Sequence, residues 1–302
     1  MANTITTMSS TMIGDTILPA LQLAVTPLDA FSLEVSDSPK FVGDKVSVNV
    51  ATAKTAGTYA TTFASGNSTT VGTAVTMLAP TFSSWFVNPN LEASATPERF
   101  LSQGVEAVKA VAKSIYQDVL ALAVTANIGD TDTTDSIDVA AADYDADDQA
   151  TLWGMLKTKG VSGPVSAIHN IAYATNILKD AKLTDKSASG SDVLQTGELP
   201  SILGVRQFYT DAFPTALTSE NTGVLYAGKE LAAIALAVPQ QVEDGLENAC
   251  GVRIEQITDP ASGLSFVWRT WMDANTGVYW GSVYVMHGQS FIQNAAVRVL
   301  SA

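Results

Sequence analysis

The sequence predicts an α+β fold, and three observations carry this prediction. Residues 41–80 alternate apolar and polar side chains on either side of a turn, which is the period of a β-hairpin. Residues 97–126 repeat apolar side chains at steps of three and four, which is the period of an amphipathic helix. The last sixty residues contain several strand-like segments that are rich in aromatic side chains. Strands and helices that are grouped in this way are typical of an α+β protein.

The first 38 residues are expected to form an arm. An apolar stretch covers residues 13–31, but Pro19 and Pro27 interrupt it, so at most two short helical pieces are expected. Little in this segment could pack by itself. We therefore expect it to lie on another surface.

Residues 41–80 are predicted to form a long, thin hairpin. The turn is expected at residues 64–68, which are Ala-Ser-Gly-Asn-Ser. A two-stranded hairpin is only marginally stable in water, so it needs a partner surface on its own body or on a neighbour. We expect the segment from Val46 to Met77 to project from the body. The valines and the methionine that define the two strands are Val46, Val48, Val50, Val71, Val75 and Met77.

The long helix is expected at residues 97–126. Thr96 can cap its N-terminus, and Pro97 occupies the first helical position, where proline is favoured. The residues Asn127 to Asp130 are expected to end it. Its apolar stripe consists of Leu101, Val105, Val108, Ala112, Ile115, Val119 and Leu122.

The rest of the chain mixes strands, loops and short helices. Asp147 and Asp148 precede an apolar helical pattern, where negative charge is favourable. Residues 183–199 are polar and are expected to form a mobile loop. The expected strands are residues 205–209, 222–231, 252–257, 266–272 and 278–286, with residues 291–300 closing the chain.

The composition excludes several classes of protein. Only 15% of the 302 residues are charged, against roughly 25% in an average protein, which fits a surface buried against copies of the same chain. The net charge is −14 with 16 Lys and Arg residues, which argues against a protein that grips nucleic acid. The single cysteine, Cys250, permits no intramolecular disulfide. No signal peptide or membrane span is recognisable, so we expect a soluble, cytoplasmically made protein.

Two segments resemble ligand-binding loops without completing them. Residues 223–230 match a phosphate-binding loop up to Glu230, which stands where Ser or Thr should bind magnesium. Residues 143–148 begin like a calcium loop, but Asp148 replaces its glycine and Gly154 replaces its last glutamate. We interpret the first as a strand and the second as a helix N-terminus. A looser cation site within residues 130–148 stays open.

The sequence predicts no catalytic, cofactor-binding or metal-binding residue. His169 and His287 are far apart and lack a ligand pattern, and no Gly-x-Ser-x-Gly turn is present. Cys250 has no redox motif around it. Five aromatic residues could suggest a carbohydrate-binding face, but strand alternation is expected to split them between two faces: Trp268, Trp271, Tyr279, Trp280 and Tyr284.

The order and length of these elements resemble the major capsid proteins of tailed bacteriophages with the Hong Kong 97-type coat fold. The resemblance lies in residues 41–80 as the extended loop and residues 97–126 as the spine helix. Residues 204–211 followed by residues 223–239 resemble the axial domain, and residues 278–300 resemble the closing strands. No single short motif is diagnostic.

The resemblance implies an N-terminal arm (1–38), an extended β-hairpin loop (39–84), a β-rich peripheral domain with the spine helix (85–128 and 241–302) and an α/β axial domain (129–240). It implies copies in pentamers and hexamers that form an icosahedral shell around double-stranded DNA. The virion capsid would assemble in the host cytoplasm, without an enzymatic role, a membrane or sequence-specific DNA binding. Portal and decoration proteins, and a separate scaffolding protein or none, are the other implied partners.

Some members of this family join a lysine of the extended loop to an asparagine near the C-terminus. Lys40, Lys45, Lys54 and Asn294 are the residues available for such a bond, but no catalytic acid can be placed. Three alternatives stay open beside a capsid protein. They are another self-assembling subunit (an encapsulin-like compartment, a tail tube or a surface layer), a hydrolase with a scattered triad, and a secreted adhesin, which the missing signal peptide disfavours.

Overall fold

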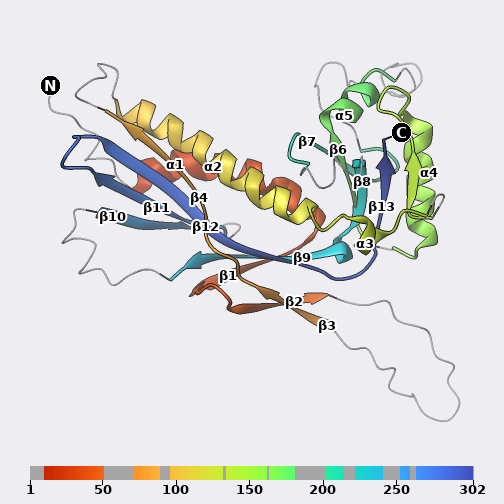
Figure 1. Cartoon of the computed structure of the whole chain (residues 1–302), viewed down its shortest axis with the longest axis horizontal. Helices are drawn as coiled ribbons and strands as arrows, with labels where there is room; N and C mark the ends of the chain where they lie inside the picture. Colours follow the sequence, from red (N-terminus) through yellow and green to blue (C-terminus); the bar gives the residue numbers. More distant parts are fainter. Residues whose placement is uncertain are drawn as a thin grey trace, which may run out of the picture.

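The computed structural model describes residues 10–50, 71–88, 96–131, 134–161, 163–180, 201–213, 222–240, 252–258 and 263–301. Two β-sheets organise the chain, and a long helix lies along one face of the larger sheet (Figure 1). The predicted α+β class is therefore confirmed. In the part of the chain that is described, no helix is both long and apolar enough to cross a membrane.

The larger sheet joins strands from both ends of the chain. Its order is β1 (Ser32–Lys40), β9 (Ala232–Pro239), β12 (Tyr279–Phe291), β11 (Ser265–Met272) and β10 (Val252–Thr258). The long strand β12 pairs with β9 through its second half, and β4 (Thr81–Val87) pairs with its first half. The predicted strands at 252–257, 266–272 and 278–286 are confirmed, with β12 running further than expected.

The long helix α2 (Pro97–Leu120) covers one face of this sheet. The hydroxyl of Thr96 accepts a hydrogen bond from the amide of Arg99 at 3.3 Å, which confirms the predicted cap. The predicted stripe is buried or half-buried throughout. Phe100 packs beneath it against Trp85 and Trp268, with ring centroids 5.4 and 6.1 Å away.

The predicted end of this helix at residue 126 is wrong. α2 ends at Leu120, and a separate short helix, α3 (Thr125–Ile128), follows. The reason is a tertiary contact: the buried guanidinium of Arg298 donates to the carbonyl of Ala123 at 3.4 Å and to the hydroxyl of Thr125 at 2.6 Å. Gly129 then turns the chain with a φ of +92°.

The N-terminal segment lies on its own chain. Residues 10–25 form a single helix, α1 (Ser10–Val25), with Pro19 inside it. Pro27 is the second residue of the short 3-10 helix η2 (Thr26–Ala30). The expectation that Pro19 would interrupt the helix is wrong; its ring points to solvent, away from the buried face. That face packs on α2 through Ile13, Ile17, Leu21 and Val25.

The hairpin base forms as predicted but does not project. β2 (Lys45–Val50) pairs with β3 (Val71–Thr76), with Val46 opposite Val75 and Val48 opposite Thr73. Val48, Val75 and Met77 are buried against alanines of β9 and against Met286 of β12. The partner surface of the base is therefore the chain's own larger sheet. The turn expected at residues 64–68 lies outside the described residues.

The smaller sheet is a five-stranded unit with the order β5 (Ser136–Asp138), β13 (Ala296–Leu300), β8 (Thr222–Gly228), β6 (Val165–Asn170) and β7 (Arg206–Thr210). Two helices pack around it, α4 (Ala146–Thr158) and α5 (Ile171–Ile177). The loop expected at residues 183–199 lies outside the described residues.

In its described part the chain passes between the two sheets three times: once through α2, from β4 to β5, and twice through short connections. From β8 it passes through the 3-10 helix η3 (Lys229–Leu231) into β9 of the larger sheet, and from β12 it passes into β13 of the smaller sheet. Of these two short connections, the first lies inside the segment 129–240 and the second inside 241–302. Each contains a polar pair, Lys229-Glu230 in the first and Gln293-Asn294 in the second, between strands that are largely buried.

Candidate functional site

The segment that resembles a phosphate-binding loop is a buried strand. Residues 223–228 belong to β8, whose seven residues are all buried, and Lys229 and Glu230 lie in η3. Gly223 is required by packing, because a Cβ there would come within 2.0 Å of the Tyr173 ring. The interpretation as a strand is confirmed. The strand pairs with β13 and β6 on its two sides, so its backbone amides are used within the sheet and are not available to a phosphate.

The acidic segment before α4 is a helix cap. The Asp145 carboxylate accepts hydrogen bonds from the amides of Asp147 and Asp148 at 2.8 and 3.2 Å, and the Asp148 carboxylate accepts one from the Asp145 amide at 3.1 Å. Burial raises the pKa of Asp148, and neighbouring carboxylates add to this increase. The helix N-terminus is confirmed. Among the described residues, no group of three or more His, Cys, Asp or Glu side chains is placed to hold a metal ion.

The two histidines lie in different parts of the molecule. His169 on β6 contacts the Gln207 side chain at 2.6 Å, and burial lowers its pKa to about 4. His287 on β12 contacts Asp118 of α2 at 2.9 Å and the Thr81 hydroxyl of β4 at 3.2 Å. Burial lowers the pKa of His287, and the Asp118 carboxylate opposes that shift.

The row Thr81, His287 and Asp118 has the hydroxyl–imidazole–carboxylate order of a hydrolase triad. The structure thus brings together residues that sequence spacing alone had not connected. His287 is only 1% exposed, however, and its backbone carbonyl also accepts a hydrogen bond from the amide of Leu78 at 2.8 Å. These hydrogen bonds connect β12 to β4, to α2 and to Leu78, just after the hairpin strand β3. We interpret the row as a structural contact that holds these elements together.

Asn294 is held within its own chain. Its amide donates to the carbonyl of Ile128 at 2.7 Å, and its carbonyl oxygen accepts from Lys159 at 3.1 Å. Lys159 also pairs with Asp135 at 2.7 Å. Lys40 and Lys45 lie at the hairpin base, and Lys54 lies outside the described residues, as does Cys250.

The five aromatic residues are divided between the two faces of the larger sheet, as predicted. Trp268 is fully buried toward α2, and Tyr279 packs on Phe100 of α2 at 5.1 Å. Trp271 and Trp280 lie on the opposite face, stacked at 5.9 Å with an interplanar angle of 4°. Phe82 and Phe86 of β4 join that face, and neither was predicted from the sequence. Phe82 and Phe86 occupy even positions of β4, whereas the buried Trp85 and Val87 occupy odd positions. This alternation in the sequence could have indicated that the two phenylalanines lie on the other face.

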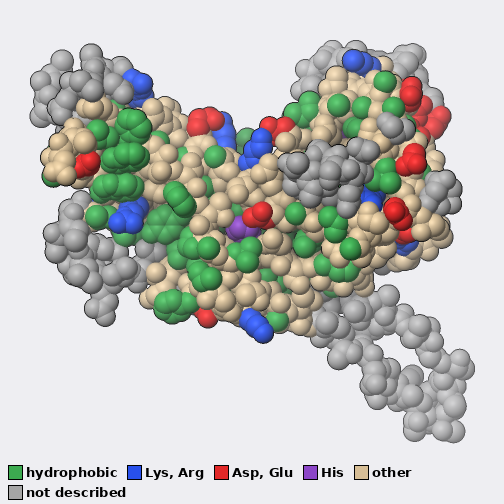
Figure 2. Space-filling view, viewed as in Figure 1, with side chains coloured by type: hydrophobic (Ala, Val, Ile, Leu, Met, Phe, Trp, Pro, Cys, Tyr) green, Lys and Arg blue, Asp and Glu red, His purple; other side chains and the backbone are tan. Residues whose placement is uncertain are grey.

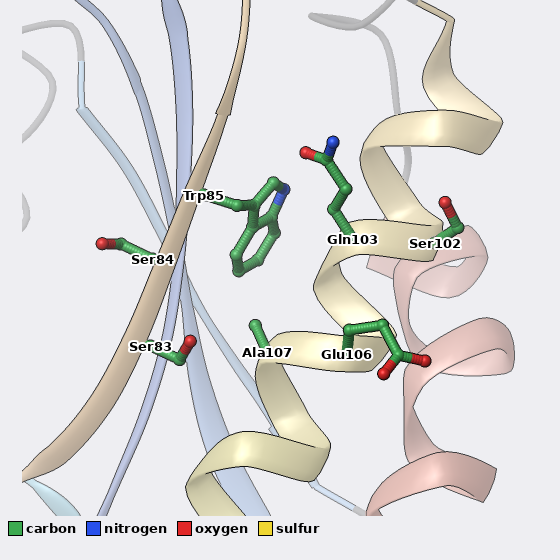
Figure 3. Close-up of a pocket in the computed structure, with 7 residues that line it drawn as sticks. All are labelled: Ser83, Ser84, Trp85, Ser102, Gln103, Glu106 and Ala107. Carbon is green, nitrogen blue, oxygen red and sulfur yellow. The ribbon is translucent and has the colours of Figure 1, made fainter.

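A groove of about 480 Å³ lies between β4 and α2 (Figure 3). The Trp85 and Gln103 side chains point into it, and the Trp85 indole nitrogen is buried without a hydrogen-bond partner among the described residues. Its other lining residues include Ser83, Ser84 and Ser102, although the Ser84 side chain points away from the groove (Figure 3). The Glu106 carboxylate pairs with Lys109 at 2.7 Å. The Ser102 hydroxyl donates to the carbonyl of Arg99 and not to Glu106, so the described residues of the groove do not pair this hydroxyl with a base.

Comparison with solved structures identifies the fold. The capsid structure of cyanophage P-SCSP1u aligns with a TM-score of 0.57 at 13% identity, over 92% of this chain and 88% of that one. The chain has the fold of phage capsid proteins. The capsid of Ralstonia phage GP4 aligns with a TM-score of 0.54 at 10% identity, over 89% and 86% of the two chains.

A third solved structure agrees with these two. The mature capsid of bacteriophage PhiM1 aligns with a TM-score of 0.52 at 10% identity, over 90% of this chain and 86% of that one. No protein-family model and no curated protein matches the sequence. At these identities the phage-capsid likeness lies in the arrangement of the elements and not in shared motifs.

Proposed function

We propose that this chain is the major capsid protein of a tailed bacteriophage, with a structural and not an enzymatic role. Many copies assemble into an icosahedral shell around double-stranded DNA, through pentamers and hexamers, in the host cytoplasm. The observation that carries the proposal is the capsid likeness across about nine-tenths of the chain. The low charged fraction of 15% supports it, because contacts between copies bury the surface that charges would otherwise solvate.

The parts of the Hong Kong 97-type fold are assigned within this proposal. The smaller sheet with α4 and α5 is the axial domain, and the larger sheet with α2 as the spine helix is the peripheral domain. The hairpin of β2 and β3 is the base of the extended loop. Scaffolding, portal and decoration proteins act as separate partners of the shell.

The test is expression of the chain alone, followed by sedimentation and negative-stain electron microscopy. Closed shells are expected, whereas a monomer under all conditions of salt and concentration would contradict the proposal. Tubes or flat sheets would instead indicate a tail-tube or surface-layer subunit. Particles from infected cells that protect DNA from nuclease support the capsid, and particles filled with an enzyme support an encapsulin-like compartment.

A further inference from the structure

The face of the larger sheet opposite α2 carries an organised row of aromatic rings. Phe86, Trp280 and Trp271 are direct cross-strand partners on β4, β12 and β11. Their ring centroids lie 5.0 Å apart for Phe86 and Trp280 and 5.9 Å apart for Trp280 and Trp271. The row therefore runs across three strands at one level.

A second aromatic pair lies at another level of the same face. Phe82 of β4 is the cross-strand partner of Tyr284 of β12, and the small residues Ser84 and Ser282 pair between the two levels. The result is a groove of about 610 Å³ with a serine floor and aromatic walls. We call it the aromatic trough, lined by Pro80, Phe82, Ser84, Arg269, Trp271, Ser282 and Tyr284.

Much of this apolar surface is open to solvent in the single chain. Phe82 is 69% exposed and Phe86 is 50% exposed. A second apolar group, at the hairpin base, consists of Phe41 at 64%, Val42 at 64% and Leu78 at 41%. Hydrophobic side chains form a broad group on the left half of the molecule in Figure 2.

The exposed rings supply part of the area that a protein contact buries. At about 200 Å² for each phenylalanine, the exposed fractions of Phe82 and Phe86 leave roughly 240 Å² of ring surface open, and Phe41 at the hairpin base adds roughly 130 Å². A standard interface buries about 800 Å² on each partner, and exposed apolar patches of several hundred Å² mark contact sites. Trp, Tyr and Arg, which also line the trough, are the residues that most often dominate binding energy.

On the neighbouring half of the same sheet face, another segment of the chain already packs through apolar contacts. There, β2 and β3 lie on β9 and β12 and bury Val48, Val75 and Met77. A hairpin of this chain is thus already seated by apolar contacts beside the trough. Arg269, 5.4 Å from the Trp271 ring, is the one charged residue among the described residues that line the trough. A highly charged partner such as nucleic acid therefore has little to bind.

We propose that the aromatic trough is the surface on which a second copy of this chain docks. The inference rests on the proposed function, because a shell subunit supplies many copies of itself as the most abundant partner. The contact surface is the part of the larger sheet formed by β4, β12 and β11, on the face opposite α2. The α1 side and the smaller sheet are not needed for this contact.

The test is the double variant Phe82→Thr/Phe86→Thr, because both side chains are exposed and threonine suits a strand. The matched control is Leu23→Ala, which removes a 77% exposed side chain from α1 on the other side of the sheet. We expect wild type and control to assemble, and the double variant to remain in small species at ten times the concentration at which wild type assembles. Its circular dichroism should match that of the wild-type subunit.

Hydroxyl-radical footprinting of the wild-type chain provides a second measurement that does not depend on a variant folding. Phe82, Phe86 and Trp271 should be several-fold less oxidised in particles than in dissociated subunits, while Leu23 should change less. Equal oxidation, or normal assembly of the double variant, would overturn the inference and leave the proposed function intact. Normal shells that lose a different phage protein would assign the trough to that protein and overturn the inference as well. Absence of wild-type assembly would instead contradict the proposed function.

Discussion

Because His169 is buried, its protonation makes the free energy of unfolding depend on pH. The ring lies within the smaller sheet, where desolvation lowers its pKa from 6.5 to about 4. The native chain therefore binds fewer protons than the unfolded chain between these two values, so the free energy of unfolding falls as the pH drops from 6.5 toward 4. The loss is on the order of 3 kcal/mol.

Urea unfolding of the unassembled subunit at several pH values between 7 and 4 would measure this loss. The variant His169→Gln should show a shallower dependence on pH than wild type, whatever its stability at neutral pH. His287 titrates in the same direction and stays in both proteins as an internal reference. Identical pH slopes would show that His169 does not titrate on unfolding.

Lys159 is expected to matter far more than an ordinary surface lysine. Its partner Asp135 is only 18% exposed; burial alone would raise the pKa of Asp135, but the hydrogen bond and charge of Lys159 hold it low. Lys159→Met should lower the free energy of unfolding by about 2 kcal/mol, because a partly buried carboxylate loses its cation.

The control for this prediction is Lys113→Met. Lys113 pairs with Asp211, but both side chains are largely exposed, at 43% and 62%, so the change should stay below about 1 kcal/mol. Urea unfolding at pH 7 gives both values. Equal losses in the two variants would contradict the role assigned to the Asp135 pair.

At the scale of single elements, Gly288 permits the hairpin base to lie on the sheet. A Cβ at this position of β12 would come within 2.3 Å of the Thr76 carbonyl oxygen and 2.9 Å of the Val75 side chain. Gly288→Ala should push β3 away and cost about 1–3 kcal/mol. Amide hydrogen exchange should rise in residues 45–50 and 71–76, while α2 stays protected.

Gly154 is the matched control for this substitution. It lies in α4, and a Cβ added there would meet no atom within 4 Å, so Gly154→Ala should be neutral or stabilising by up to about 1 kcal/mol. Unchanged exchange in β2 and β3 of Gly288→Ala would mean that the hairpin base does not depend on this close approach.

The elements differ in how far the sequence could predict them. The cap at Thr96, the strand at residues 223–228 and the helix N-terminus at Asp147 and Asp148 were all predicted, because each depends on residues within a few positions of one another. The end of α2 and the intact α1 around Pro19 were not. Both depend on partners distant in sequence, Arg298 for the first and the face of α2 for the second.

At the scale of the whole molecule, the hairpin tip is predicted to serve assembly and not folding. The base is already anchored by Val48, Val75 and Met77 on the chain's own sheet. Deleting residues 56–67 should therefore leave the free energy of unfolding of the subunit within about 1 kcal/mol of wild type. The same deletion should reduce the yield of particles several-fold. Sedimentation and calorimetry would separate the two effects.

Replacing the same residues by a Gly/Ser stretch of equal length tests whether composition or mere length matters. This replacement should also impair assembly if side chains of the tip make the contacts. Unchanged shells after the deletion would show that the tip is dispensable.

The sequence by itself determined the α+β class, the long amphipathic helix, the hairpin pairing and the scarcity of charge. These follow from periodicity and composition, which are local properties. Only the tertiary structure decided which strands share a sheet, that β9 and β13 each cross to the other sheet, and that the hairpin base lies on its own chain. It also decided that Phe82, Phe86, Trp271 and Trp280 gather on one open face. Strand alternation separates two faces, but the face that helices cover is chosen by contacts between residues far apart in the chain.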